Sequence, residues 1–254
     1  MAETGWVINL ADSPERMESA GAELERGGFA VARVDACDGR GQGVNGFDGY
    51  DDALARRFMG RSLSAGELGC HESHMRALTA FLDSGDDIAL ILEDDFRFTE
   101  GGAEAAKAVI AWMRQNPRWH AVNIGARKRK ITTPLAQLAG RELVRAHYFP
   151  ILAHAMVWSR AGAKALLAQR HPVFCPADNM YRHVLTRSGR GLALYPPAAE
   201  ADAFDSEITA RSGGLRGKRG RTALYNWRRQ KRLWTEKLVA LRHQRAARQG
   251  GEGV

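Results

Sequence analysis

The sequence predicts an α/β fold in which a mostly parallel sheet is flanked by helices on both faces. Short apolar runs of strand length alternate with helical segments along residues 6–195, and this alternation is typical of parallel sheets. The length of 254 residues suffices for one domain with a full hydrophobic core. Ligands of such sheets bind beyond the carboxyl ends of the strands, so residues that follow strands are the candidate site residues.

The N-terminal part of the chain predicts a strand, a helix and a second strand. Trp6–Leu10 is a short β-prone run, and the Asp-Ser-Pro sequence at 12–14 is the start signal of a helix over Ser13–Arg26. Two glycines end this helix, and residues 29–34 form the second strand.

The middle of the chain predicts a loop, a helix and a buried strand. Gly39–Gly49 contains five glycines without an apolar period, which indicates an irregular surface loop. The Ser-x-x-Glu spacing of Ser64 and Glu67 is that of a capping box, and the helix that it starts extends to about Leu82. Ile88–Leu92 is a continuous apolar run, typical of a strand that is buried on both faces.

The remaining elements continue the alternation of strands and helices up to Tyr195, where two prolines end the regular pattern. They are a helix at 103–115, a strand at 121–124, a strand at 151–158, a helix at 160–169, and a last helix and strand. Residues 1–200 therefore form the folded domain, and residues 201–254 form a tail.

Three adjacent carboxylates, Glu93, Asp94 and Asp95, follow the buried strand directly. Their mutual repulsion is costly unless a cation is bound, and oxygen ligands select a hard ion such as Mg²⁺ or Mn²⁺. Such an ion would neutralise the charge that develops on a leaving diphosphate. The alternative is that the acids only open the next helix, where negative charge complements the helix dipole.

Glu67, His71 and His74 fall at helical spacings of four and three and share one face of the predicted helix. Such a set can ligate zinc, but it lacks the i, i+4 histidine pair of the helical zinc hydrolases. We therefore favour histidines that are hydrogen-bonded in the structure or that contact a substrate.

The N-terminus and the cysteines predict a soluble, unexported chain. No cationic, apolar leader precedes the first strand, and no run of about 18 uncharged residues occurs. Cys37, Cys70 and Cys175 lie far apart and form no Cys-x-x-Cys pair, so reduced thiols in the cytoplasm fit best.

The C-terminal tail differs from the rest of the chain in charge. Arg211–Arg248 holds 13 Lys and Arg against Glu236 alone, and the rest of the chain carries 24 basic against 28 acidic groups, a net of −4. Large apolar residues recur at helical spacing from Thr222 onward, as in a cationic helix that lies on an anionic membrane surface. The alternative is a helix that packs its apolar stripe on the domain.

Several motifs resemble glycosyltransferase family 25, which includes bacterial lipooligosaccharide galactosyltransferases and collagen galactosyltransferases. The order of the motifs is preserved from about residue 6 to 197. They are Val7–Leu10 with Ser13–Arg16, Val34–Ala36, Leu63–Cys70 with Ser73-His74, Ile88–Asp95, His154–Arg160 and Pro176–Asp178.

The resemblance implies a GT-A-like fold and a catalytic domain over 1–200 that transfers a sugar, often galactose, with inversion. It also implies a UDP-sugar donor, a divalent cation, and a saccharide or glycolipid acceptor of lipopolysaccharide or lipooligosaccharide type. Asn9 and Arg16 would lie near the nucleotide, Glu93 and Asp94 at the ribose or the cation, and Asp95 would be the direct metal ligand.

An inverting transfer also needs a base on the acceptor side that removes the hydroxyl proton. Asp178 is the first choice, and its alternative role is a helix N-cap. His154 and His74 are the competing candidates. The basic run Arg127–Lys130 departs from the better known family members. A solvated turn is the favoured interpretation, and the alternative is that the run faces the donor phosphates or an anionic acceptor.

Two other classes of function account for parts of the sequence. A nucleic-acid-binding protein would explain the basic tail with its tryptophans but not the three acids, which repel phosphate without a metal. A metal-dependent phosphoryl-transfer enzyme would use the acids, but no nucleophile or phosphate-binding loop is recognisable. A cytoplasmic transferase, peripheral on the inner face of the membrane, is the prediction that accounts for both features.

Overall fold

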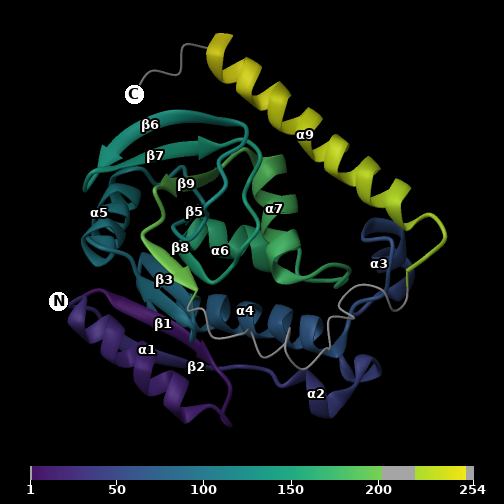
Figure 1. Cartoon of the computed structure of the whole chain (residues 1–254), viewed down its shortest axis with the longest axis horizontal. Coiled ribbons are helices and arrows are strands. Elements are labelled where there is room, and N and C mark those ends of the chain that lie inside the picture. The colour runs from purple at the N-terminus through teal and green to yellow at the C-terminus, as the bar shows by residue number, and fades with distance from the viewer. Residues whose placement is uncertain (1, 202–220, 250–254) are drawn as a thin grey trace.

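The computed structural model describes residues 2–201 and 221–249 and contains an eight-stranded sheet in the order β2-β1-β3-β8-β5-β9-β7-β6 (Figure 1). A two-stranded sheet pairs β10 with β4. The strands are β1 (Thr4–Asn9), β2 (Ala30–Asp35), β3 (Ile88–Glu93), β4 (Phe96–Phe98), β5 (Ala121–Asn123), β6 (Thr132–Leu138), β7 (Arg141–Ala146), β8 (Ala155–Ser159), β9 (Gly191–Tyr195) and β10 (Ala199–Ala201).

The large sheet confirms the predicted mostly parallel α/β fold. β1 pairs in parallel with β2 and β3, and β5 pairs in parallel with β9. β8 lies antiparallel between β3 and β5, and β7 lies antiparallel between β9 and β6. All strands of this sheet except β8 and β7 therefore run in one direction, as in a GT-A-like fold.

Helices cover both faces of the sheet (Figure 1). One apolar core lies between the sheet and α3, α4, α6 and α7, and the other lies between the sheet and α1 and α5. The helices are α1 (Pro14–Arg26), α2 (Gly39–Gln42), the 3₁₀ turn η1 (Val44–Gly46), α3 (Asp52–Phe58), α4 (Ala65–Ser84), α5 (Gly102–Gln115), α6 (Arg160–Leu167), α7 (Ala177–Ser188) and α9 (Tyr225–Gln249).

β3 is buried on both faces, as the sequence predicts. Ala89 and Ile91 belong to one core, whereas Leu90 and Leu92 belong to the other. This follows from the alternation of side chains along a strand. Glu93, the last residue of β3, therefore lies at the end of this buried strand, where both apolar cores end.

Local interactions determine both ends of α4. Ser64 accepts from the backbone N–H of Glu67, and the Glu67 carboxylate accepts from the backbone N–H of Ser64, so the predicted capping box is present. Gly85 ends the helix with a φ of 83°, a conformation that glycine adopts without steric cost.

The predicted pattern differs from the structure in several places, and α3, β4 and β10 are among the elements that the prediction lacks. The glycine-rich segment predicted as a loop contains α2 and η1. The strand predicted from Ile151 begins only at Ala155, because Ile151 and Leu152 lie in an exposed loop. The hairpin of β6 and β7 is not predicted, although Ala139 and Gly140 at its turn both have the positive φ of a two-residue hairpin turn.

The helix α9 packs on the folded domain against α7 and α3. Glu236 and Ala240 are buried in this contact, whereas most of the helix surface stays exposed. No helix in residues 2–201 and 221–249 combines the length and the apolar character needed to cross a bilayer. The rest of the predicted tail, 202–220 and 250–254, lies outside the described residues.

Candidate active site

A cavity of about 360 Å³ opens at the carboxyl ends of β1 and β3, where the sequence places the site. The three carboxylates after β3 lie in its wall together with residues of the loop after β2 and of α4. The lining residues are Ile8, Leu10, Arg16, Ala36, Cys37, Asp38, Gly39, Arg40, Ser64, Gly66, Cys70, Ser73, His74, Glu93, Asp94 and Asp95.

The end of β1 and the start of α1 hold Asp94 in place. Asn9, almost fully buried, donates from Nδ2 to Asp94 Oδ2 at 2.7 Å and to the Ser13 carbonyl at 2.9 Å. The guanidinium of Arg16 lies 2.5 Å from Asp94 Oδ1. The structure thus brings together the predicted residues Asn9, Arg16 and Asp94, and both oxygens of Asp94 have a partner.

Asp95 lacks the partners that Asp94 has. Its Oδ1 is buried without a hydrogen-bond partner, and its Oδ2 lies 3.5 Å from the Arg16 guanidinium. Burial, followed by the charge of Glu93, raises the pKa of Asp95 to about 6. A buried carboxylate oxygen without a donor, beside a second carboxylate, is chemically suited to a divalent cation. The residues therefore fit the predicted Mn²⁺ or Mg²⁺ ion.

Glu93 interacts with a histidine of α4. His74 is buried, and its Nε2 lies 3.2 Å from Glu93 Oε1, while the side chain of Glu93 stays one-third exposed. Burial acts to raise the pKa of Glu93, but the hydrogen bond and charge of His74, with the charges of His154 and Arg16, outweigh it and lower the pKa. Glu93 is therefore ionised at neutral pH and oriented by His74.

His154 lies on the other side of Glu93, directly before β8. Its carbonyl accepts from the backbone N–H of Glu93 at 2.9 Å. Its ring is buried close to Gly125, where an added Cβ would lie 2.4 Å from Nε2. Burial lowers the pKa of His154 despite the nearby charge of Glu93. It is not among the residues that line the cavity.

Asp178 lies in the first turn of α7 and is half-buried. Pro176 is the N-cap of this helix, so the alternative role of Asp178 as an N-cap is wrong. Asn179 Nδ2 donates to Asp178 Oδ1 at 2.7 Å. Asp178 is not part of the lining of the 360 Å³ cavity.

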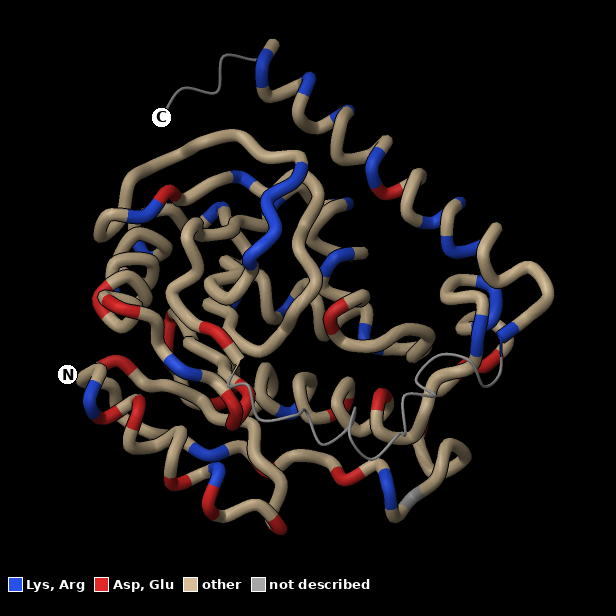
Figure 2. Tube along the Cα trace, viewed as in Figure 1, with Lys and Arg blue, Asp and Glu red and all other residues tan. Residues whose placement is uncertain are grey.

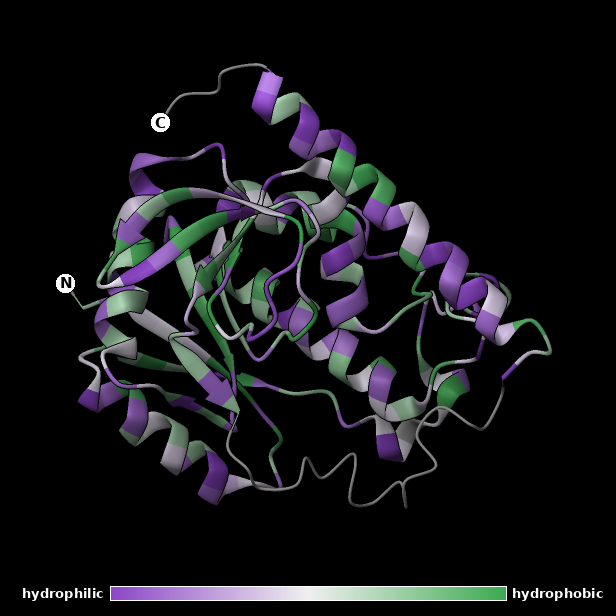
Figure 3. Cartoon of the chain, turned by 45° about the horizontal axis from the view of Figure 1, so that its top comes forward, coloured by the Kyte–Doolittle hydropathy of each residue, from purple (hydrophilic) through white to green (hydrophobic). Residues whose placement is uncertain are grey.

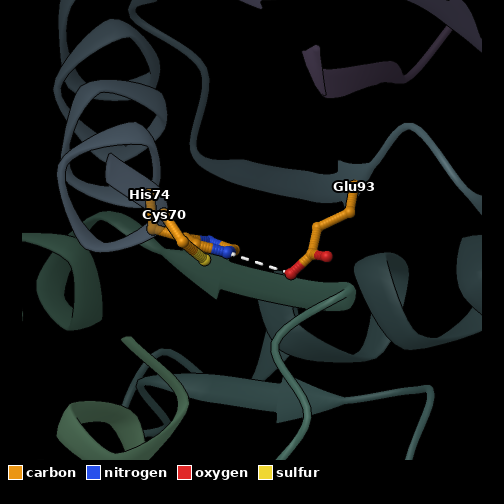
Figure 4. A group of neighbouring side chains, drawn as sticks. All are labelled: Cys70, His74 and Glu93. Atoms are coloured by element: carbon orange, nitrogen blue, oxygen red, sulfur yellow. Dashed lines mark hydrogen bonds and ion pairs between the residues drawn. The ribbon is translucent and has the colours of Figure 1, made fainter. Parts of the chain in front are cut away.

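The structure also adds a residue that the sequence analysis does not place in the site. Cys70, one helical turn before His74, points toward His74 and Glu93 (Figure 4). The Cys70 sulfur, a ring nitrogen of His74 and a carboxylate oxygen of Glu93 all lie within 4.8 Å of one another. The i, i+4 spacing of Cys70 and His74 is a signal that the sequence contains.

The predicted set of Glu67, His71 and His74 does not converge. Glu67 forms the capping box and a bidentate pair with Arg61 at 2.5 and 2.8 Å. His71 lines a different cavity of about 600 Å³, and burial lowers its pKa to about 4. Helical spacing placed these side chains near one face, but each has a different environment in the tertiary structure.

The basic run after β5 is exposed, as expected for a solvated turn. Arg127 pairs with Glu200 at 2.7 Å, Arg129 pairs with Glu142, and Lys130 lies 5.1 Å from the ring centroid of Tyr148. The cysteines Cys37, Cys70 and Cys175 form no disulfide with one another.

Comparison with known proteins points to one family. The sequence profile described as glycosyltransferase family 25 (LPS biosynthesis protein) matches residues 2–139. The chain is 29% identical over 178 residues to a probable inactive glycosyltransferase 25 family member 3 of Rattus norvegicus, covering 65% of this chain and 30% of that protein. It is 26% identical over 183 residues to procollagen galactosyltransferase 1 of Danio rerio, covering 68% and 30%.

A third relative is the inactive glycosyltransferase 25 family member 3 of Homo sapiens, 30% identical over 178 residues, with 65% of this chain and 28% of that protein covered. The chain thus spans about three tenths of the length of the relatives that it matches. The matched family profile includes the ends of β1 and β3, from which the cavity is built.

Proposed function

The chain belongs to glycosyltransferase family 25, and on this premise we propose that it transfers a hexose, in first place galactose, from a UDP-sugar to a saccharide acceptor. The observation that supports this most is the environment of Asp95. Asp95 lies in the wall of the cavity and has a buried carboxylate oxygen without a hydrogen-bond partner. Beside it lie Asp94, which is paired with Arg16, and the guanidinium of Arg16, which is partly exposed. This arrangement suits a cation and a diphosphate better than it suits a structural role.

Four residues have separate roles in the proposed donor site. Asp95 and Glu93 would hold Mn²⁺ or Mg²⁺, which when bound offsets negative charge on the departing nucleotide. Arg16 lines the cavity and is one-third exposed, so its guanidinium can also bind a diphosphate oxygen. Asn9 is buried against Asp94 and acts as a positioning residue.

The proposed transfer inverts the anomeric carbon. An acceptor hydroxyl oxygen forms the new bond to this carbon as the bond to the diphosphate breaks, and a base takes the hydroxyl proton. His74, His154 and Asp178 are the three candidates for the base. His74 is the one that lines the cavity, and Glu93 orients its ring, so the geometry supports His74 more directly than Asp178, which the sequence favours.

The donor is tested without knowledge of the acceptor. Thermal unfolding is measured with UDP-, GDP-, CMP- and dTDP-sugars, each with and without Mn²⁺. A ligand at 100 times its Kd stabilises the native state by about 2.7 kcal/mol, which is a readily measured shift. We expect a Mn²⁺-dependent shift with one UDP-sugar. If oligonucleotides shift the unfolding temperature and none of the nucleotide sugars does, the proposal is overturned in favour of a nucleic-acid-binding protein.

The transfer reaction needs its own measurement, because two of the similar proteins have names that describe them as inactive. Release of UDP from the donor that binds is followed with and without saccharide acceptors of the lipopolysaccharide type. We expect an acceptor-dependent rate. Donor binding without any release of UDP would leave a nucleotide-sugar-binding protein and refute the transferase proposal.

We further propose that the acceptor is a glycolipid reached from an anionic membrane surface, to which α9 attaches the domain. α9 has eight Lys and Arg against Glu236 alone, and Figure 2 shows basic residues along the whole helix. The side that holds Glu236 and Ala240 faces the domain. Basic residues near an anionic leaflet each contribute about 1 kcal/mol.

The exposed side of α9 carries the large apolar residues. Trp227, Trp234 and Leu238 are 58%, 60% and 54% exposed, and they follow one another at spacings of seven and four, which places them on one stripe. Lys231 and Lys237 lie 5.0 and 4.9 Å from the ring centroids of Trp227 and Trp234. Hydrophilic and hydrophobic segments accordingly alternate along the helix in Figure 3. Exposed tryptophans between basic residues are typical of helices in a lipid headgroup layer.

The double substitution Trp227→Gln and Trp234→Gln is expected to weaken binding to vesicles that contain phosphatidylglycerol by more than about tenfold, because both rings lose their apolar burial. Binding is measured by cosedimentation, with phosphatidylcholine vesicles as the neutral comparison. Asn226→Ala with Gln230→Ala is the matched control, since both residues are exposed and uncharged on the same helix. Equal binding of the double variant and the control would refute the membrane contact.

A further inference from the structure

We propose that Cys70, His74 and Glu93 form a binding site for Zn²⁺ in the wall of the donor cavity, which shares Glu93 with the proposed oxygen site at Asp95. All three residues line the cavity, so an ion can enter from solvent. Among the described residues this is the one group of three Cys, His, Asp or Glu side chains whose ligand atoms lie so close together.

The geometry comes from one helix and one strand. Cys70 and His74 are separated by one turn of α4 and point to the same side, where Glu93 at the end of β3 meets them (Figure 4). The ligand atoms lie within 4.8 Å of one another. Tetrahedral zinc with its usual bond lengths requires separations of roughly 3.3 to 3.7 Å. Small side-chain rotations therefore complete the site without a change of the backbone.

The chemistry of the three ligands selects the ion. Thiolate and imidazole together favour zinc over Mn²⁺ and Mg²⁺, which prefer the carboxylate oxygens at Asp95. Three protein ligands leave the fourth tetrahedral position open toward the cavity. His74 is buried, and its ring packs edge-on against Tyr181 at 5.5 Å between centroids, which restricts its orientation. The ring nitrogen of His74 already faces Glu93 at 3.2 Å.

Zinc at this position would inhibit the transferase, and this part of the inference depends on the proposed function. Glu93 belongs to both the zinc site and the proposed Mn²⁺ site, and His74 is a candidate base. Zn²⁺ bound to Glu93 and His74 thus competes with Mn²⁺ for a shared ligand and prevents His74 from accepting a proton. Binding of Zn²⁺ itself does not require that the protein be a transferase.

The site is tested with Co²⁺ as a spectroscopic substitute for Zn²⁺ on the full, reduced chain. We expect a sulfur-to-cobalt charge-transfer band in the near ultraviolet that Zn²⁺ abolishes on titration. Cys70→Ser should remove the band and weaken Zn²⁺ binding by at least about tenfold, since even outer-shell changes cost 10- to 100-fold. Cys37→Ser is the matched control, because Cys37 lines the same cavity outside the cluster. An unchanged band in Cys70→Ser, or no band in the unsubstituted chain, overturns the proposal.

A second measurement needs no substitution. Alkylation of Cys70 by iodoacetamide is followed by peptide mass spectrometry, with the buried Cys37 and Cys175 as internal references. Zn²⁺ should slow alkylation of Cys70 by at least about tenfold, the same range as above. Equal rates with and without Zn²⁺ contradict the site. UDP release is then measured with and without Zn²⁺ for each protein. If Zn²⁺ inhibits the unsubstituted chain but not Cys70→Ser, relative to the zinc-free rate of each, the site is connected to the transfer.

Discussion

Asp95→Asn is expected to stabilise the metal-free protein at neutral pH and to abolish Mn²⁺-dependent binding of the donor. The Asp95 pKa is raised to about 6 in the folded state by burial and by Glu93, whereas an aspartate in an unfolded chain has a pKa of about 4. The folded state therefore binds the proton more tightly, and the stability falls as the pH rises from about 4 to about 6. Above this range the ionised carboxylate costs about 1–3 kcal/mol, which asparagine avoids.

The measurement is thermal unfolding at pH 4.5 and 7.5 with and without Mn²⁺ and the UDP-sugar. The gain in stability from Asp95→Asn should be larger at pH 7.5, and the donor-induced shift should be lost at both values. Asp87→Asn serves as the control, because Asp87 is exposed at the opposite end of β3 and should change neither quantity. If Asp95→Asn destabilises the metal-free protein and keeps the donor-induced shift, Asp95 has a structural role and is not a cation ligand.

The sequence predicts the central parts of this fold well, because their signals are local. The capping box at Ser64, the glycines after α1 and the apolar run of β3 each determine an element within a few residues. The hairpin of β6 and β7 is missed since its strands lie at the edge of the sheet, where partial exposure removes the simple apolar pattern. Ile151 and Leu152 cause the opposite error. Their apolar side chains predict a buried strand, but both residues are exposed in a loop.

The sequence predicts which residues gather at the strand ends but not how they pair. The rule that ligands bind beyond strand ends predicts that Asn9 and Glu93 lie near one another, because each ends a strand, and in the structure β1 and β3 are parallel neighbours. The hydrogen bond from Asn9 to Asp94 joins residues 85 positions apart and depends on the packing of the sheet. The proximity of Cys70 to Glu93 depends in the same way on how α4 packs against the sheet. Spacing along the chain cannot supply such distances.

His74→Asn is expected to lower kcat by about 100- to 10,000-fold, the range that general base catalysis contributes, while the affinity for the donor changes much less. The physical reason is that His74 lines the cavity and is oriented by Glu93, so the acceptor hydroxyl can reach its ring. Asp178→Asn should change kcat by less than about tenfold, because Asp178 lies outside the cavity lining.

The comparison of these two variants separates catalysis from support of the structure. A base that is lost removes the acid limb of the pH profile of kcat/KM, whereas a loosened structure lowers the rate at every pH. His154→Asn is measured in parallel, since its buried ring adjoins Glu93 without lining the cavity. A loss of transfer in Asp178→Asn with donor binding kept, and near-normal transfer in His74→Asn, would assign the base to Asp178 as the sequence favours. In that case the role of His74 would be to orient Glu93 through their hydrogen bond.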